Sequence, residues 1–313
     1  MKESPRIALV IPVYNEEVTI EKVIDDFAKV NLNLEIFIIN NNSTDRTVEI
    51  AKKKLESISN KGEIFHISRQ GKANAIRHAF RNIEADIYVM IDGDDTYCAN
   101  DIYNLIQPIL DSAADMVVGD RMSFGKYNCE NKRPFHSLGN NLVCRLINTL
   151  YKTSLNDIMS GYRVMTREFV KNYPILHEGF ELETDITLHA LDKRYQIIEV
   201  PIDYKERVNS KSKLNTFQDG WRVMVTIFKV FKDYKPLLFF SVLSLIFFLL
   251  GLALGGPVIL EFIQTRYIKH VPLAILASGL MIISILILSI GITLDTIVRN
   301  HRFIYEQNCL KNN

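Results

Sequence analysis

Three carboxylates follow a run of apolar residues in the segment Tyr88–Tyr97. The residues "YVMI" come first, and Asp92, Asp94 and Asp95 follow within four positions, around Gly93. Like charges so close together repel each other unless a cation joins them. Hard oxygen ligands at this spacing suit Mg²⁺ or Mn²⁺, ions that also bridge phosphates. A solvated turn is the alternative, because Asp and Gly are common in turns for backbone reasons of their own.

Four further polar segments favour a site over a turn. "IPVYNEE" and "IINNNSTD" follow apolar runs and precede helical patterns, and "RQGKANAIRHAF" places a Gly-Lys pair where a helix begins. Helix N-termini and their backbone N–H groups bind anions such as phosphates. "DIMSGYRVM" and "ERVNSKSKLN" add basic and hydroxyl side chains. All five segments in this order are rare by accident, so we expect a site that handles phosphate groups.

The elements that must position these segments alternate along the chain. Short runs of the residues that favour strands recur as "RIALVI", "LEIFII", "IFHI", "DIYVMI", "DMVVG" and "IIEVPI". Most are too continuously apolar for a strand buried on one face only, and helical patterns separate the early ones. The sequence therefore predicts an α/β domain with a mostly parallel sheet flanked by helices. In such sheets, ligands bind at the carboxyl ends of the strands, where "DGDD" follows "IYVMI".

The C-terminal part of the chain has a different composition. Residues 237–260 and 271–294 contain no charged side chain. Each run is long enough to cross a hydrocarbon core of about 30 Å, for which roughly 20 apolar residues suffice. A pair of buried core helices is the alternative. We expect a transmembrane hairpin, preceded over residues 214–236 by an amphipathic helix at the membrane interface, or else by a core helix.

Charge and composition indicate where the protein lies. The basic residues near the outer ends of the two spans outnumber those in the link between them, which favours both termini in the cytoplasm. No apolar leader opens the chain, so the N-terminal domain is expected to stay in the cytoplasm. The 313 residues are 48% hydrophobic with a net charge of +1, which excludes disorder and a broad nucleic-acid surface. Four widely spaced cysteines indicate reduced thiols and no structural zinc.

The ordered motifs resemble family 2 glycosyltransferases with the GT-A fold. The similarity is greatest to the polyprenyl-phosphate glycosyltransferases, the branch with dolichyl-phosphate mannose synthases and bacterial undecaprenyl-phosphate glycosyltransferases. It runs from "IALVIPVYNEE" through "NNNSTDRT", "GKANAIRHAF", "VMIDGDDTY" and "DMVVGDR" to "DIMSGYRVMTREFV", and then to "IIEVPIDYKERVNSKSKLNTFQDGWRV" and the spans. It covers nearly the whole chain.

On the donor side, the resemblance implies a nucleotide-sugar and a divalent cation, Mg²⁺ or Mn²⁺. Asp92 and Asp94 would form the DxD pair that binds the metal. Where many relatives have an acidic pair that contacts the base, this chain has Asn40 and Asn41, so the base stays open. The donor site implied by the resemblance and by the need for cations at a diphosphate is Pro12, Tyr14, Glu16, Asn41, Lys72, Asp92, Gly93, Arg207, Ser212 and Lys213.

On the acceptor side, Arg121, Arg133 and Ser137 fall where the family holds the acceptor phosphate. A phosphate nucleophile is already anionic at neutral pH, so it needs cationic capture more than a strong base. Glu183 and Asp185 lie where many relatives place a carboxylate on the acceptor side. The alternative is a helix N-terminus charged to suit its dipole.

The expected protein is an inverting glycosyltransferase of a bacterial or archaeal membrane. It has a catalytic domain over residues 1–213, the interfacial helix 214–236 and the membrane part 237–313, and it transfers one sugar to a polyprenyl phosphate. A glycan or lipid-linked oligosaccharide acceptor and an inert nucleotide-binding scaffold are the alternatives. A transporter is least expected, because neither span contains an ionisable residue. Homo-oligomer formation is left open.

Overall fold

The computed structural model describes residues 4–123, 134–175, 182–205, 225, 228 and 231–312, without the side chains of 134–141 and 311–312. The chain forms two compact units, Met1–Trp221 and Arg222–Asn313. The expected boundary between catalytic domain and interfacial helix, at residues 213 and 214, lies outside the described residues, and so does most of that helix.

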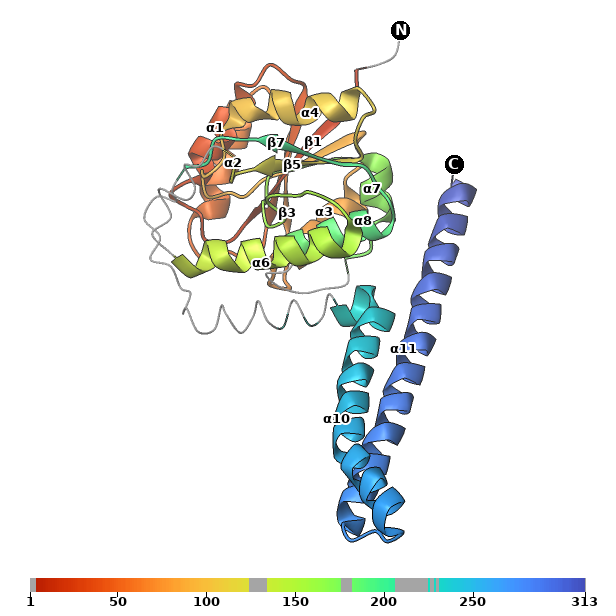
Figure 1. Ribbon diagram of the computed structural model, residues 1–313. Helices are drawn as coiled ribbons and strands as arrows, with labels where there is room; N and C mark the ends of the chain where they lie inside the picture. The colour runs from red at the N-terminus through yellow and green to blue at the C-terminus, as the bar shows by residue number, and fades with distance from the viewer. Residues whose placement is uncertain are drawn as a thin grey trace. The chain divides into compact units, whose positions relative to one another are not determined.

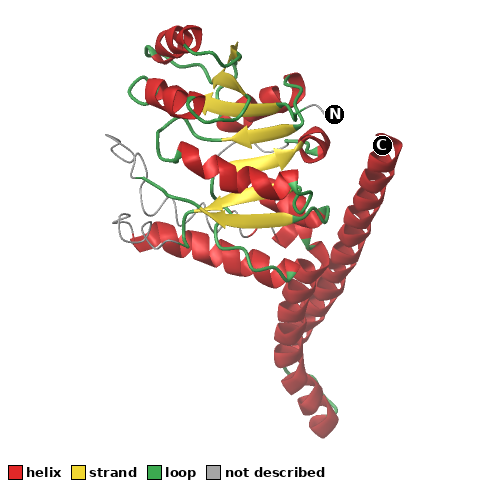
Figure 2. Ribbon diagram, turned by 90° about the horizontal axis from the view of Figure 1, so that it is seen from above, coloured by secondary structure: helices red, strands yellow, loops and turns green. Residues whose placement is uncertain are grey.

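In its described part, the first unit contains one sheet of seven strands in the order β3-β2-β1-β4-β6-β5-β7 (Figure 2). The strands are β1 (Ile7–Val13), β2 (Leu34–Asn40), β3 (Gly62–His66), β4 (Ile87–Met90), β5 (Met116–Asp120), β6 (Arg163–Thr166) and β7 (Ile197–Pro201). All neighbours are parallel except that β6 runs antiparallel to both β4 and β5. The mostly parallel sheet confirms the predicted fold class. The sequence did not predict β6.

Helices cover both faces of this sheet (Figure 1). Those of the first unit are α1 (Ile20–Ala28), α2 (Thr47–Ser57), α3 (Lys72–Asn82), the 3₁₀ turn η1 (Ala99–Asp101), α4 (Ile102–Leu110), α6 (Pro134–Tyr151), α7 (Arg167–Asn172) and α8 (Leu182–Asp192). In α1 the apolar residues recur at helical spacing, and all four are buried: Ile20, Val23, Ile24 and Phe27.

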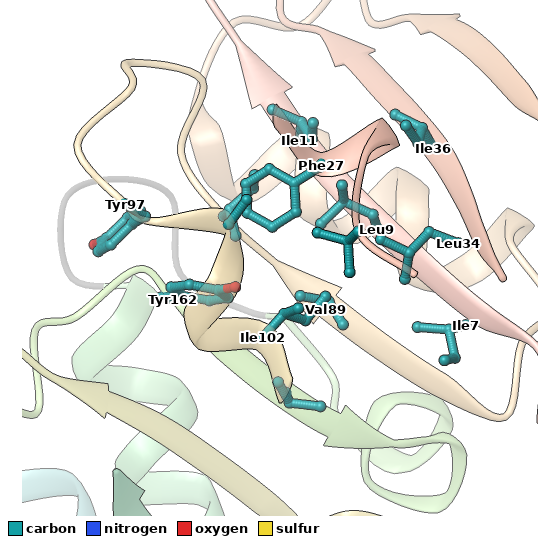
Figure 3. Close-up of a cluster of buried hydrophobic side chains, with 14 of the residues drawn as sticks. Ile7, Leu9, Ile11, Phe27, Leu34, Ile36, Val89, Tyr97, Ile102 and Tyr162 are labelled. Atoms are coloured by element: carbon teal, nitrogen blue, oxygen red, sulfur yellow. The ribbon is translucent and has the colours of Figure 1, made fainter. Parts of the chain in front are cut away.

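Two hydrophobic clusters lie on opposite faces of the sheet, because successive strand side chains point to opposite sides. Leu9 and Ile11 of β1 belong to one cluster, which also includes residues of α1, α2 and α4 (Figure 3). Ala8 and Val10 belong to the other, which includes residues of α3, α7 and α8. Burial on both faces explains why the strands read as continuous apolar runs. It also leaves the carboxyl ends of the strands as the place for polar residues.

The second unit is a hairpin of two long apolar helices, α10 (Pro236–Thr265) and α11 (Val271–Asn312), which lie side by side (Figure 1). Both are long and apolar enough to cross a membrane.

The two helices pack through buried residues at heptad spacing, five of the six small. Ser244, Gly251 and Val258 of α10 are buried, as are Ala277, Ser284 and Gly291 of α11. The Ser244 hydroxyl donates to the Ser284 carbonyl at 2.9 Å, and the Ser284 hydroxyl donates to the Ser244 carbonyl at 3.0 Å. A Cβ on Gly291 would lie 2.7 Å from Phe240 Cβ, so the backbones approach closely there.

Candidate active site

The Lys72 ammonium lies between two carboxylates at the carboxyl edge of the sheet. Its Nζ is 2.5 Å from Asp92 Oδ1 and 2.6 Å from Glu183 Oε1. The side chains of Lys72 and Asp92 are each 30% exposed, and that of Glu183 is 12% exposed. Asp92 follows β4, Lys72 begins α3, and Glu183 lies in the first turn of α8. Three elements distant in sequence therefore converge on one charge cluster.

The two carboxylates set the charge of Lys72. Burial by itself would lower the pKa of this ammonium, but the negative charges of Asp92 and Glu183 and their hydrogen bonds outweigh it and raise the pKa above its ordinary value. Lys72 is therefore a fixed positive charge at the sheet edge, at and above neutral pH. Gly71 positions the start of α3, where Lys72 lies. The φ of Gly71 is 131°, which is unfavourable for other residues, and its N–H donates to Asn41 Oδ1 at 2.9 Å.

The three carboxylates after β4 have different partners, which relieves their repulsion. Asp92 pairs with Lys72, and Asp94 Oδ1 accepts a 2.7 Å hydrogen bond from the Thr96 hydroxyl. Asp95, in the left-handed conformation at φ 58°, forms an ion pair with Lys22 of α1. Asp95 therefore fastens the loop to a helix. The roles of Asp92 and Asp94 as the metal-binding pair stay predictions.

A close backbone contact fixes the other side of Asp92. A Cβ on Gly161 would lie 2.5 Å from Asp92 Oδ2 and 3.2 Å from the Tyr97 hydroxyl oxygen. The Gly161 N–H donates to that hydroxyl at 2.9 Å. The Tyr97 ring is buried against Tyr162, with ring centroids 5.3 Å apart. Glycine at position 161 therefore allows the "DIMSGYRVM" segment to contact the carboxylate with its backbone.

The loops after β1 and β4 also contact each other. Gly93 packs against the end of β1, where its Cβ would lie 2.9 Å from Val13 Cγ1 and 3.7 Å from the carbonyl oxygen of Pro12. The Thr19 hydroxyl donates to the Gly93 carbonyl at 2.7 Å. The expected donor residues Pro12 and Gly93 are thus adjacent.

Hydrogen bonds likewise join the loops after β1 and β2. Asn15, at φ 55°, accepts the Thr44 N–H at 2.8 Å, and the Glu16 N–H donates to the Thr47 hydroxyl at 2.8 Å. Tyr14 in the same loop is exposed. The expected donor residues Tyr14 and Glu16 therefore lie on a braced loop at the carboxyl edge. Asn41 differs, because it is buried and its oxygen holds Gly71.

Arg121, after β5, is held by a buried carboxylate. Its Nε and Nη2 donate to Asp157 Oδ2 and Oδ1 at 2.7 and 2.9 Å, a bidentate pair in which Arg121 is 10% exposed and Asp157 is 0% exposed. Its guanidinium carbon lies 5.4 Å from the centre of the Tyr204 ring. Asp157 is in turn oriented by Glu199, whose carboxylate accepts the N–H groups of Asn156 and Asp157.

The two carboxylates at the start of α8 have different partners. Glu183 binds Lys72 at the sheet edge, whereas Asp185 is buried and accepts the Tyr173 hydroxyl at 2.7 Å. Sequence alone left the two carboxylates equivalent. The structure brings only Glu183 to the cluster of Lys72 and Asp92.

Residues 8–173 match the family described as Glycosyl transferase family 2, which is more than half of the chain. The chain belongs to glycosyl transferase family 2. A full-length relative of this transferase is the glycosyltransferase AglJ of Haloferax volcanii, 27% identical over 298 residues that cover 95% of each chain. The dolichyl-phosphate hexose transferase of the same organism is 28% identical over 72% of this chain and 93% of its own.

The fold of this transferase is that of solved GT-A structures. Glucosyl-3-phosphoglycerate synthase from Mycobacterium tuberculosis, solved with Mn²⁺, UDP and glucosyl-3-phosphoglycerate, superposes with a TM-score of 0.58 at 20% identity. The match covers 74% of this chain and 81% of that one. At this identity it shows a common fold, and it confirms the GT-A architecture predicted from the sequence.

Some of the expected site residues of the transferase lie where the structure does not describe side chains. Ser137 lies in α6, but its side chain is not among those described. Arg133, Arg207, Ser212 and Lys213 lie outside the described residues altogether. Their roles at the acceptor phosphate and over the donor diphosphate stay predictions.

Sequence reasoning missed Arg163, a buried cation in β6. Its Nε donates to the Ser160 carbonyl at 2.9 Å, and its Nη2 donates to the Ile158 carbonyl at 2.7 Å. Its Nη1 donates to the Thr187 hydroxyl of α8 at 2.9 Å. Burial lowers the pKa of this guanidinium. Arg163 thus binds both the loop that contacts Asp92 and the helix that carries Glu183. In the sequence, only the place of Arg163 within "DIMSGYRVM" could have indicated this role.

A divalent cation fits the pair Asp92 and Asp94. Within the described ranges, no group of three or more His, Cys, Asp or Glu side chains is arranged to hold a metal ion. Two carboxylates suffice for Mg²⁺ or Mn²⁺ when substrate phosphates and water complete the coordination. Asp92 Oδ1 is bound by the Lys72 ammonium, and the Asp92 side chain is 30% exposed. The residues present therefore match the donor set that such an ion prefers.

Proposed function

We propose that this family 2 glycosyltransferase moves one sugar from a nucleotide-sugar to a polyprenyl phosphate at the membrane surface, with inversion at the sugar. The observation that carries the proposal is the combination, in one chain, of the transferase fold and an apolar hairpin. A water-soluble acceptor would not require such a hairpin, whereas a polyprenyl acceptor is confined to the bilayer. The likeness to a dolichyl-phosphate hexose transferase over 93% of that protein supports the same acceptor class.

On the donor side, Asp92 and Asp94 would hold Mg²⁺ or Mn²⁺ against the diphosphate. When bound, such an ion neutralises the charge that develops on the leaving diphosphate. Lys72 adds a fixed positive charge at the same edge of the sheet. Pro12, Tyr14 and Glu16 would line the nucleotide site beside Gly93, while Asn41 would act mainly through Gly71.

On the acceptor side, the nucleophile would be a phosphate oxygen, which is anionic at neutral pH. Arg121 would face this phosphate together with Arg133 and Ser137. The Asp157 carboxylate takes two of the donors of Arg121, so in this role it would position the guanidinium. A glycan acceptor would instead need a general base. The two candidate carboxylates, Glu183 and Asp185, are engaged by Lys72 and Tyr173, which favours the phosphate acceptor.

The membrane would hold the active site on the cytoplasmic side. Lys232 and Lys235 precede α10, and Arg299 and Arg302 follow the second apolar run, against Arg266 and Lys269 in the link. The excess at the outer ends favours both termini inside the cell. In this orientation the donor reaches the enzyme from the cytoplasm and the acceptor phosphate lies at the headgroup level of the same leaflet.

Membranes that contain the full-length chain would test this function with radiolabelled UDP- and GDP-sugars. The expected product is a labelled lipid that partitions into organic solvent and releases its sugar in mild acid, as a sugar phosphate does. The Asp94→Asn variant in matched membranes is the control. Label in a water-soluble glycan would support the alternative acceptor, and label in neither fraction with every donor would support an inert scaffold.

A further inference from the structure

The Lys72 ammonium forms ion pairs with two carboxylates that have different proposed roles. Asp92 is a proposed metal ligand, and Glu183 is not. Two negative charges thus share one positive charge at a partly exposed position. A second cation that approaches Asp92 must therefore compete with the ammonium, because the two positive charges repel each other at contact distance.

Asp92 has little freedom to avoid this competition. Its Oδ2 packs against the Cα of Gly161, where even a methyl group would come within 2.5 Å. Its Oδ1 is the oxygen that binds Lys72. A carboxylate held in this way cannot turn its other oxygen outward without moving the loop of Gly161 and Tyr97. The ammonium therefore occupies the Asp92 oxygen that does not contact Gly161.

Glu183 offers the ammonium a second position. It accepts from Nζ at 2.6 Å and is only 12% exposed, so a charge placed there is partly shielded from solvent. Arg163 and Thr187 keep α8 in place, since the Thr187 hydroxyl accepts from Arg163 and donates to the Glu183 carbonyl at 3.0 Å. If Lys72 leaves Asp92, it keeps one carboxylate and can turn toward a bound diphosphate.

We propose, building on the function above, that Lys72 is a resident cation that competes with the divalent ion for Asp92, and that Glu183 retains the ammonium when the donor binds. The ion alone displaces Lys72 from Asp92 and leaves the ammonium with Glu183 as its one carboxylate partner in the cluster. The ion together with a nucleoside diphosphate supplies the displaced ammonium with a new anionic partner. Metal and donor binding are therefore coupled, and each strengthens the other. Glu183 is in this scheme a positioning residue for Lys72.

A purely structural role for Lys72 predicts a different result. If the lysine only braces α3 against α8, its removal lowers the stability of the protein and weakens or leaves unchanged the binding of Mn²⁺. If it competes for Asp92, its removal strengthens the binding of Mn²⁺ in the absence of nucleotide. The sign of the change in metal affinity thus separates the two.

The test is Mn²⁺ binding by the full-length chain in detergent, followed by the electron paramagnetic resonance signal of free Mn²⁺, with and without UDP. Lys72→Met, with Lys72→Gln as a second variant, is expected to bind Mn²⁺ about tenfold more tightly than the wild type without UDP. Glu183→Gln is expected to bind it more weakly, because the ammonium then relies on Asp92 alone. UDP should raise the Mn²⁺ affinity of the wild type more than that of Lys72→Met.

Lys22→Met is the matched control, because it removes the same charge from the neighbouring pair with Asp95. It should change Mn²⁺ affinity less than twofold. Equal gains for Lys22→Met and Lys72→Met, or no gain for Lys72→Met and Lys72→Gln, would overturn the inference and leave the proposed function intact. Asp94→Asn reports on the site itself: if it binds Mn²⁺ as the wild type does, the proposed metal site is wrong and the inference falls with it.

Discussion

The backbone of Gly161 contacts the carboxylate of Asp92, so closely that a Cβ at position 161 would lie 2.5 Å from Asp92 Oδ2. The Gly161 N–H is at the same time bound by the Tyr97 hydroxyl. The position of the Asp92 carboxylate is therefore limited by a residue that has no side chain.

Replacing Gly161 with alanine is expected to lower the rate of transfer by about 10- to 100-fold, because the methyl group displaces the Asp92 carboxylate and small misplacements are costly in catalysis. The backbone of Gly161 is not in the left-handed region, so the fold should tolerate the change. Initial rates and thermal unfolding of the purified protein measure the two effects. Gly279→Ala, at a glycine with open space around it, is the control. Wild-type rates in Gly161→Ala would contradict the prediction.

Replacing Asp94 with asparagine should reduce transfer by about 10²-fold or more while the protein stays folded, because the amide keeps the shape but removes the charge that binds a cation. Exhaustive chelation of the wild type should have the same effect, and added Mg²⁺ or Mn²⁺ should reverse it. The measurement is the initial rate against metal concentration. A variant that turns over normally in both metals would show that Asp94 is no ligand.

Replacing Asp157 with alanine should destabilise the protein by about 3 kcal/mol, because it removes the buried carboxylate that binds two N–H donors of the nearly buried Arg121 cation. Transfer should also fall, since Arg121 loses its orientation. Unfolding in detergent measures the stability. Glu84→Ala is the control, because its pair with Arg167 is exposed and should contribute about 1 kcal/mol or less. Similar losses in both variants would mean that the Arg121–Asp157 pair is not buried in solution.

In the hairpin, Gly291→Leu should separate α10 from α11, because a Cβ there already lies 2.7 Å from Phe240 Cβ. The expected loss is about 1–3 kcal/mol, the usual range for overpacking. Gly279→Leu adds the same side chain where nothing lies within 4 Å and should cost much less. Thermal unfolding of both variants in one detergent compares them. Equal stability would show that the two helices do not pack as described.

Cys144 should resist alkylation at pH 8. Burial raises the pKa of its thiol to about 11, so only about one in a thousand Cys144 thiols is ionised at that pH. Its reactivity should rise steeply between pH 9 and 11, provided that the protein stays folded. Peptide mass spectrometry after a short pulse of iodoacetamide measures it, with Cys309, which is partly exposed, as the reference. Rapid labelling of Cys144 at pH 8 would mean that the helix α6 opens there.

The sequence predicted the parts of the fold that depend on local patterns. Runs such as "IALVI" indicate a strand buried on both faces, and Leu9 and Val10 do point into opposite clusters. The resemblance likewise anticipated the family and the GT-A fold. Asp92 at the end of β4 follows from the rule that ligands bind at the carboxyl edge of such sheets.

The sequence could not predict contacts that depend on how distant segments pair. The strand β6 is short, begins with a charged residue and runs antiparallel, so no pattern of apolar residues indicates it. Arg121 binds Asp157, which lies beyond α6, and Lys72 binds Glu183 of α8 as well as Asp92. Spacing along the chain says nothing about such pairs. It also could not separate Glu183 from Asp185, because their difference lies in which neighbour each faces.

The place of β6 between β4 and β5 has a consequence for the order in which the protein is made. Strands β1 to β4 pair among themselves, and they leave the ribosome first, so the edge that carries Asp92 can assemble early. Strand β5 has only β6 and β7 as neighbours in the described sheet, and both are synthesised after it. The segment that leads to Arg121 must therefore wait, unpaired, until the chain has passed Thr166. Pairing of β1 to β4 can thus precede the pairing of β5, whereas the contacts of Asp92 with Gly161 and of Lys72 with Glu183 form only after β5 has been synthesised.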